Sequence, residues 1–164
     1  IATMPAWGLG NAAGILTGQN LGAKQPERAE KSVWRAGMLN MGFLVLIGIS
    51  WIFLAVPVIK IFTDIPEVIS FSTMYIHLIS IAYILLGYTM VISRALNAAG
   101  EVKVVTWLYI LMFYVIQIPL AYALGITFDL GSNGVFTAIL VSEIILAVAC
   151  IVVFRKGKWK HTKV

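Results

Sequence analysis

Long apolar stretches separated by short polar segments dominate this chain. Five stretches are almost free of Asp, Glu, Lys and Arg: residues 1–23, 36–59, 68–93, 104–128 and, apart from Glu143, 130–154. A helix of about 20 apolar residues crosses the roughly 30 Å hydrocarbon core of a bilayer. The pattern predicts an all-α integral membrane protein whose helices span about residues 2–22, 34–60, 68–95, 104–126 and 131–154.

The cations fall on alternate connections between these stretches. Four lie in residues 24–35, two in residues 94–103 and five in residues 155–164, so only Lys60 of the twelve Lys and Arg residues lies on the other side. Loops rich in Lys and Arg remain in the cytoplasm. We therefore expect a multi-pass protein of the plasma membrane, with the basic tail at residues 155–164 in the cytoplasm.

Composition supports a membrane protein and excludes several other classes. Hydrophobic residues make up 60% of the chain and charged residues only 12%, whereas about a quarter of a soluble domain is charged. The net charge of +5 comes from residues that flank apolar stretches, which favours the lipid bilayer over nucleic acid as a partner. With two His, one Cys and one acid inside the spans, no metal site or catalytic pair can be assembled, so we expect no enzyme and no cofactor.

A polar stripe marks the third stretch. Thr73, His77, Ser80 and Gly87 follow one another at spacings of four, three and seven residues, which places them on one helical face. Polar stripes on membrane helices face protein or water, because lipid offers no hydrogen-bond partners. His77 can respond to protons near neutral pH, or simply bond a neighbouring helix. Thr73, His77 and Ser80 are therefore candidates for a substrate or ion pathway.

Two further polar residues lie deep in the later stretches. An ionised carboxylate near the bilayer centre, where Glu143 falls, costs roughly 2.5–3.5 kcal/mol unless it is paired, protonated or hydrated. Glu143 is a candidate for ion or substrate handling, although the neighbouring helical positions are apolar. Gln117 either satisfies the backbone carbonyl that Pro119 leaves free or faces a transport path.

Glycines and prolines predict how the helices pack and end. Gly10, Gly14, Gly18 and Gly22 recur every fourth residue, which predicts a bare helix face that packs closely against another helix or opens towards a cavity. Gly22 and Gly100 suit helix C-caps, and prolines at positions 26 and 66 suit the first turns of the following helices.

Three segments carry a family resemblance. The first joins Pro5 to the glycine-rich stretch, which ends Leu-Thr-Gly-Gln-Asn-Leu-Gly-Ala at residues 16–23 and includes Gln19. The second is Arg-Ala-Leu-Asn-Ala-Ala-Gly-Glu, from Arg94 to residue 101, and the third is Gln-Ile-Pro-Leu-Ala-Tyr at residues 117–122. In this order they resemble the C-terminal lobe of the multidrug and toxic compound extrusion (MATE) transporters.

The resemblance implies a twelve-helix, two-lobe transporter in which this chain supplies helices eight to twelve, with the N-terminal lobe and the seventh helix elsewhere in the same protein. It also implies efflux of amphipathic or cationic, drug-like small molecules by antiport with Na⁺ or H⁺. One family branch places acidic cation-binding residues on the seventh and tenth helices. The stretch that corresponds to the tenth, residues 68–93, has His77 but no acid, so the resemblance does not locate the coupling site.

Two alternatives compete with an antiporter. A related lipid-linked oligosaccharide flippase would carry cationic residues in its cavity, and the spans here contain none near their middle. A non-transporting membrane scaffold subunit would need no pathway at all. Efflux driven by a cation gradient separates the transporter from the scaffold.

Overall fold

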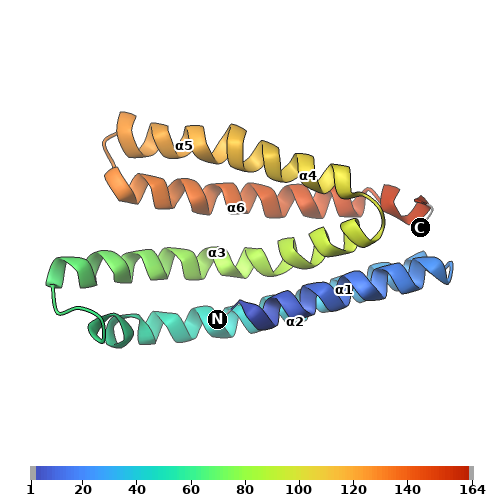
Figure 1. The fold of residues 1–164 in the computed structure, drawn as a ribbon, viewed down its shortest axis with the longest axis horizontal. Coiled ribbons are helices and arrows are strands. Elements are labelled where there is room, and N and C mark those ends of the chain that lie inside the picture. Colours follow the sequence, from blue (N-terminus) through green and yellow to red (C-terminus); the bar gives the residue numbers. More distant parts are fainter. Residues whose placement is uncertain (1–2, 163–164) are drawn as a thin grey trace.

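A computed structural model describes residues 3–162, which form a bundle of long helices (Figure 1). The long helices are α1 (Met4–Gly22), α2 (Pro26–Lys60), α3 (Pro66–Ala98) and α6 (Gly131–Arg155). Between α3 and α6 the chain forms α4 (Val102–Ile110), the π-helix η1 (Leu111–Gln117), α5 (Ile118–Tyr122) and a second π-helix η2 (Ala123–Thr127). A 3₁₀ turn, η3 (Lys158–His161), follows α6. Residue 2 of the first predicted span and residues 163–164 of the predicted tail lie outside the described residues.

The chain runs back and forth along the bundle axis. Figure 1 shows the turns at residues 23–25 and 99–101, together with η3, at one end of the bundle, and the turns at residues 61–65 and 128–130 at the other. We call the first end the basic end, because the three cation-rich segments meet there. This clustering is the arrangement that the alternation of charge predicts.

Four helical segments of the described chain are long and apolar enough to cross a membrane. They are α2, α3, the continuous segment from Val102 to Thr127, and α6. Helix α1 does not belong to this set, because its glycines and the polar side chains of Asn11, Gln19 and Asn20 lower its hydropathy. Helix α1 is therefore less apolar than α2 and α3, the two helices that it contacts.

Helix α3 lies at the centre of the bundle and packs against α1, α2 and α6. At its crossing with α2, a Cβ on Gly87 would lie 3.0 Å from the Cα of Met41, so only glycine permits this approach. The buried Asn40 donates a hydrogen bond from Nδ2 to the Gly87 carbonyl at 3.0 Å. Interfaces between membrane helices depend on such close backbone contact, because lipid removes the hydrophobic driving force.

Half of the predicted glycine ladder packs against α3. A Cβ on Gly14 would lie 3.2 Å from the Arg94 carbonyl oxygen, and one on Gly10 would lie 3.6 Å from the Arg94 side chain. Gly18 and Gly22 have no such neighbour within 4 Å. The close-packing interpretation therefore describes the first half of the ladder only.

The segment from α4 to η2 departs from regular α-helix on both sides of Pro119. Proline lacks the N–H that an α-helix needs at this position, and local π-helical adjustments can satisfy the backbone groups that a proline frees in a membrane helix. Among the described residues, the Gln117 side chain forms no hydrogen bond. It therefore does not bond the backbone carbonyl that Pro119 leaves free.

The two turns at the basic end share one hydrogen-bond pattern. Glu101 N–H bonds the Leu96 carbonyl across Gly100, whose φ is +85°. Gln25 N–H bonds the Asn20 carbonyl in the same way, but the left-handed residue there is Lys24, with φ of +56°. The prediction for Gly100 is thus confirmed and that for Gly22 is wrong. Gly22 remains helical, because the reversal falls two residues later, just before Pro26 starts α2.

The tail folds back on the basic end instead of extending into solvent. Trp159 is 1% exposed, stacks on Phe154 and donates its indole N–H to the Phe154 carbonyl at 2.9 Å. Lys160 pairs with Glu30 of α2 at 2.6 Å and with Glu27 at 3.2 Å. We call the contacts of Trp159 and Lys160 the clasp. At least one tail cation is therefore paired with protein.

The clasp contains an ion pair that lies outside the predicted spans. The hydrogen bond that Lys160 donates to Glu30 lowers the pKa of Glu30 and raises the pKa of Lys160. A carboxyl whose pKa is lowered by folding stabilises the folded form at neutral pH, and this contribution is lost as pH falls through that pKa. The clasp is therefore expected to weaken in acid.

Candidate functional site

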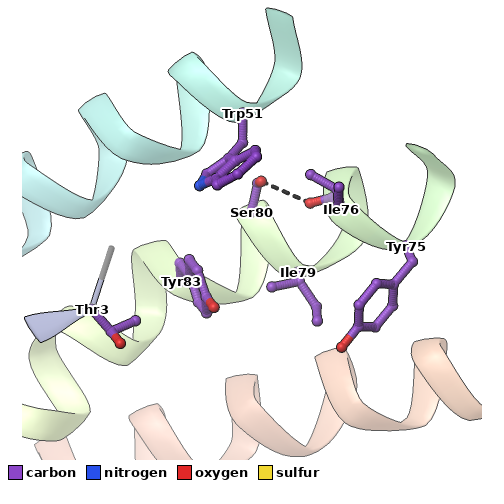
Figure 2. Close-up of a pocket in the computed structure, with 7 residues that line it drawn as sticks. All are labelled: Thr3, Trp51, Tyr75, Ile76, Ile79, Ser80 and Tyr83. Atoms are coloured by element: carbon purple, nitrogen blue, oxygen red, sulfur yellow. Dashed lines mark hydrogen bonds between the residues drawn. The ribbon is translucent and has the colours of Figure 1, made fainter. Parts of the chain in front are cut away.

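An aromatic pocket lies between α2, α3 and the start of α1 (Figure 2). Its volume is about 420 Å³, and no charged side chain lines it. Trp51 of α2 and Tyr75 and Tyr83 of α3 supply aromatic surface, as Figure 2 shows. The remaining lining residues are Thr3, Ile76, Ile79 and Ser80. A neutral aromatic wall suits flat apolar compounds, and it attracts cations through the ring faces.

Helical spacing brings these rings to the pocket. Tyr75, Ile79 and Tyr83 stand four residues apart, so they share one face of α3. Trp51 reaches the same space because α2 approaches α3 closely at Gly48, where a Cβ would lie 3.2 Å from the Ser80 carbonyl oxygen. The Ser80 hydroxyl bonds the Ile76 carbonyl at 2.7 Å within its own helix, which leaves its oxygen available as an acceptor.

A second, wider groove runs along α3 towards the 61–65 turn. Its volume is about 840 Å³, and it contains Thr73 and His77 of the predicted polar stripe. Lys60 and Asp64 line its outer part. His77 Nε2 lies 3.4 Å from the Ile52 carbonyl oxygen of α2, while Thr73 bonds its own helix at the Ile69 carbonyl. The stripe thus faces α2, with Thr73 and His77 in the groove and Ser80 in the aromatic pocket.

The two deep polar candidates lie away from this pocket. Glu143 of α6 is half-buried, and its Oε2 atom is buried without a hydrogen-bond partner among the described residues. Gln117 is half-buried in η1 and lines none of the cavities named here.

The predicted family-motif residues occupy structural positions. Pro5 lies in the first turn of α1, the backbone carbonyl of Gln19 accepts the Ala23 N–H near the end of α1, and Pro119 lies near the start of α5. The Arg94 guanidinium lies 5.2 Å from the centre of the Trp7 ring, which joins α3 to α1 by a cation–π contact. Arg94 also lines a third cavity, of about 500 Å³, between α1, α3 and α4.

The aromatic residues of the pocket were missed from the sequence, although part of the signal was available. The four-residue spacing of Tyr75, Ile79 and Tyr83 was visible, but the same composition suits a face that contacts lipid. The approach of Trp51 depends on how α2 crosses α3, which no periodicity reveals. Residues 3–162 contain no group of three or more His, Cys, Asp or Glu side chains that could hold a metal ion.

Comparison with known proteins identifies the family. The MatE family model matches residues 1–123. A FAD transporter of Shewanella oneidensis is 30% identical over 132 residues, which cover 80% of this chain and 29% of that protein. A probable multidrug resistance protein NorM of Thermotoga maritima is 24% identical over 164 residues, covering 100% of this chain and 35% of that protein. The chain thus spans about a third of the length of these curated relatives.

A solved structure has the same fold. The crystal structure of the eukaryotic MATE transporter AtDTX14 superposes with a TM-score of 0.86 at 21% identity, over 96% of this chain and 35% of that one. The match confirms the predicted fold class, an all-α membrane bundle that corresponds to part of a transporter. The resemblance drawn from the three sequence segments is confirmed as well: the chain belongs to the MatE family.

Proposed function

We propose that this chain forms part of a secondary active transporter that exports amphipathic or cationic compounds by antiport with Na⁺ or H⁺. The transporter works in the plasma membrane, with the basic end of the bundle in the cytoplasm, and it needs no cofactor besides the coupling ion. The remaining helices, including the N-terminal lobe, complete the transport path.

The observation that carries this proposal is the aromatic pocket, taken together with membership of the MatE family. Export of varied organic cations requires a surface that attracts positive charge without a rigid set of hydrogen bonds. Trp51, Tyr75 and Tyr83 supply ring faces of that kind, and the pocket has no Lys or Arg in its lining to repel a cation.

One variant tests the proposal directly. The full-length protein, expressed in bacteria that lack their own drug exporters, should export ethidium when an ion gradient is present. Trp51→Ala should raise the KM for ethidium roughly fivefold, because one cation–π contact contributes about 1 kcal/mol. Trp107→Ala is the matched control, since Trp107 is 68% exposed and lines none of the pockets described above.

Three results would count against the proposal. Equal KM values for Trp51→Ala and Trp107→Ala would remove the aromatic pocket from substrate binding. Export that persists after both the Na⁺ and the H⁺ gradients are collapsed would contradict antiport. A protein that inserts normally but exports none of a panel of organic cations would favour the scaffold alternative.

A second substrate class is suggested by the relative from Shewanella oneidensis, whose name describes an FAD transporter. The flat aromatic ring system of a flavin could stack on the same three rings. Its phosphates would need cations that the aromatic pocket lacks. Fluorescence of flavins in the culture medium, compared between cells with and without the full-length protein, distinguishes this class from organic cations.

A further inference from the structure

The cavity of about 500 Å³ between α1, α3 and α4 combines positive charge with hydrogen-bonding groups. We call it the Arg94 cavity, because Arg94 is the one charged side chain among the described residues that line it. The uncharged polar side chains of its lining are Ser93, Asn97, Thr106 and Tyr109. A cavity with one cation and no acid in its lining attracts an anion.

The Arg94 guanidinium is held in place but has no anionic partner within residues 3–162, where it forms neither an ion pair nor a side-chain hydrogen bond. A Cβ on Gly10 would lie 3.6 Å from the Arg94 Cγ atom, and the guanidinium carbon lies 5.2 Å from the centre of the Trp7 ring. A cation–π contact uses none of the five N–H donors of arginine. They remain available for a phosphate or a carboxylate, which arginine binds with two parallel hydrogen bonds.

The other polar groups divide into donors and acceptors. The hydroxyl of Ser93 donates to a carbonyl of its own helix at 2.7 Å, so in its 3.2 Å contact with the Tyr109 hydroxyl the tyrosine is the donor. The Thr106 hydroxyl also donates to a carbonyl of its own helix, at 2.9 Å. The oxygens of Thr106 and Tyr109 can therefore accept from a ligand. The Asn97 side chain forms no hydrogen bond among the described residues, and its Oδ1 atom is buried, which leaves its amide nitrogen as a second donor beside Arg94.

The depth of Arg94 along α3 matches that of lipid headgroups. Arg94 lies four residues before Ala98, the last residue of α3, and directly after the charge-free stretch at residues 68–93. With a rise of about 1.5 Å per residue, it lies roughly 6 Å from the basic end of the helix. The stretch before it is long enough to cross the hydrocarbon core, which is roughly 30 Å thick. Arg94 is therefore at the level of the phosphate layer on the basic side.

Apolar side chains complete the lining of the Arg94 cavity. Trp7 of α1 and Val102 and Ile110 of α4 are exposed, so the cavity reaches the surface of the described bundle. Ile110 lies two turns further from the basic end than Val102, deeper in the hydrocarbon region. A ligand that fills the cavity thus meets charge and hydrogen bonds at one level and apolar surface at the next, as an amphiphile requires.

We propose that the Arg94 cavity binds an anionic phospholipid, an inference that goes beyond the proposed export and does not depend on it. Arg94 is the counter-ion of the lipid phosphate, and the Asn97 amide is a second donor to it. Hydroxyls of the headgroup donate to the oxygens of Thr106 and Tyr109, and the start of an acyl chain follows Ile110. Basic pockets between membrane helices on the cytoplasmic side are typical sites for anionic headgroups. A phosphorylated solute shares the phosphate chemistry, and the depth of Arg94 favours the lipid.

The first experiment measures lipid binding to the purified full-length protein. Phosphatidylglycerol is added to the protein in detergent, and native mass spectrometry counts the bound lipids. Arg94→Gln should lower the affinity about tenfold, because it removes hydrogen bonds from a charged donor. Lys103→Gln is the matched control, since Lys103 is an exposed cation near the same end and does not line the Arg94 cavity. Equal losses in the two variants would show only general attraction to basic residues and would overturn the proposal.

Two pairs of compounds identify the group that is recognised and its source. Diacylglycerol has the same acyl chains as phosphatidylglycerol but no phosphate, so its binding should not change in Arg94→Gln. Riboflavin 5′-phosphate and riboflavin make the same comparison for a solute. Binding of riboflavin 5′-phosphate that depends on Arg94, without such binding of phosphatidylglycerol, would keep the phosphate site but overturn the lipid as its occupant. If neither phosphate compound distinguishes Arg94→Gln from the wild-type protein, no phosphate site exists in this cavity.

The second experiment needs no variant, which matters if Arg94→Gln does not fold. Phosphatidylglycerol that carries a photoreactive diazirine at the start of one acyl chain is added to the wild-type full-length protein and illuminated. Mass spectrometry of the peptides should locate adducts on Trp7, Met90 or Ile110, the apolar lining residues that lie nearest to the proposed chain. Adducts confined to other parts of the protein would overturn the proposal. Because both experiments measure binding, an absence of ethidium efflux would refute the proposed export without affecting this site.

Discussion

Two tryptophans illustrate how much the surroundings of a single residue decide its role. Trp159 belongs to a short run crowded with lysines, yet it is 1% exposed, whereas Trp107 belongs to an apolar stretch and is 68% exposed. The hydropathy of the surrounding sequence alone would predict an exposed Trp159 and a buried Trp107. Trp159 is buried because Gly157, with φ of +70°, turns the chain back onto Phe154 at the end of α6.

Trp159→Ala should therefore release the tail. Truncation of a buried tryptophan typically costs about 3–5 kcal/mol, which exceeds what the pairs of Lys160 with Glu27 and Glu30 can offset. In detergent solution, we expect trypsin to cleave the full-length variant after Lys158 and Lys160 much faster than it cleaves the wild-type protein. Trp107→Ala should leave that rate unchanged, and equal rates for both variants would show that the clasp is not held by Trp159.

Single residues were predicted from the sequence where their chemistry is local. The positive φ of Gly100 and the helix starts at positions 26 and 66 follow from the backbone properties of glycine and proline, and the structure confirms them. The contact between Ser93 and Tyr109 could not be predicted in this way. Their hydroxyls lie 3.2 Å apart, and only the packing of α3 against α4 decides that they meet.

At the scale of whole elements, the glycines differ according to what each helix packs against. A Cβ on Gly87 would lie 3.0 Å from the Met41 Cα of α2, whereas a Cβ on Gly18 would have no neighbour within 4 Å. The contact at position 87 therefore requires glycine, whereas position 18 has room for a larger side chain. Gly87 permits the α2–α3 crossing, while Gly18 only makes α1 more flexible.

Substitution by alanine should separate these two roles. Gly18→Ala should raise the thermal stability of the full-length protein slightly, because alanine favours a helix over glycine by up to about 1 kcal/mol. Gly87→Ala should lower it, since α2 and α3 would have to move apart and the bond from Asn40 would lengthen. Unfolding temperatures in detergent provide the measurement. Stabilisation by both variants would contradict the close crossing.

The elements themselves were largely predictable, but their internal geometry was not. Long runs without charge predict where helices lie, since the polar backbone must be satisfied within the membrane. The π-helical turns η1 and η2 have the same hydropathy as an α-helix, so only Pro119 hinted at a disturbance in that segment. Helix α1 was predicted to resemble the other spans, although its close contact with α3 at Gly14 depends on the lack of side chains more than on apolar ones.

At the scale of the whole molecule, the three basic segments meet at one end of the bundle, which makes the orientation testable. Lys31, near the start of α2, and Lys158, at the start of η3, lie at the basic end, whereas Glu67 lies in the first turn of α3 at the opposite end. All three positions are exposed and can each be replaced by a single cysteine. In intact cells, an impermeant thiol reagent should label the cysteine at position 67 and spare the other two.

The control for this prediction is to open the cells. Labelling of positions 31 and 158 should then rise to match that of position 67, because all three side chains are accessible in the structure. Labelling of position 31 or 158 from outside intact cells would reverse the proposed orientation. It would also place the mouth of the groove that contains His77 on the cytoplasmic side.

The clasp has a consequence for how the protein is made. Membrane helices enter the bilayer in the order of their synthesis, so α2 is in place long before residue 160 leaves the ribosome. Glu27 and Glu30 can pair with Lys160 only after 133 and 130 further residues have been synthesised. The ring of Trp34 likewise contacts Phe154 only after α6 has been made. Until then the clasp cannot close at the basic end of the bundle. Closure of the clasp therefore requires that α6 has been inserted with its C-terminal end on the same side of the bundle as the start of α2.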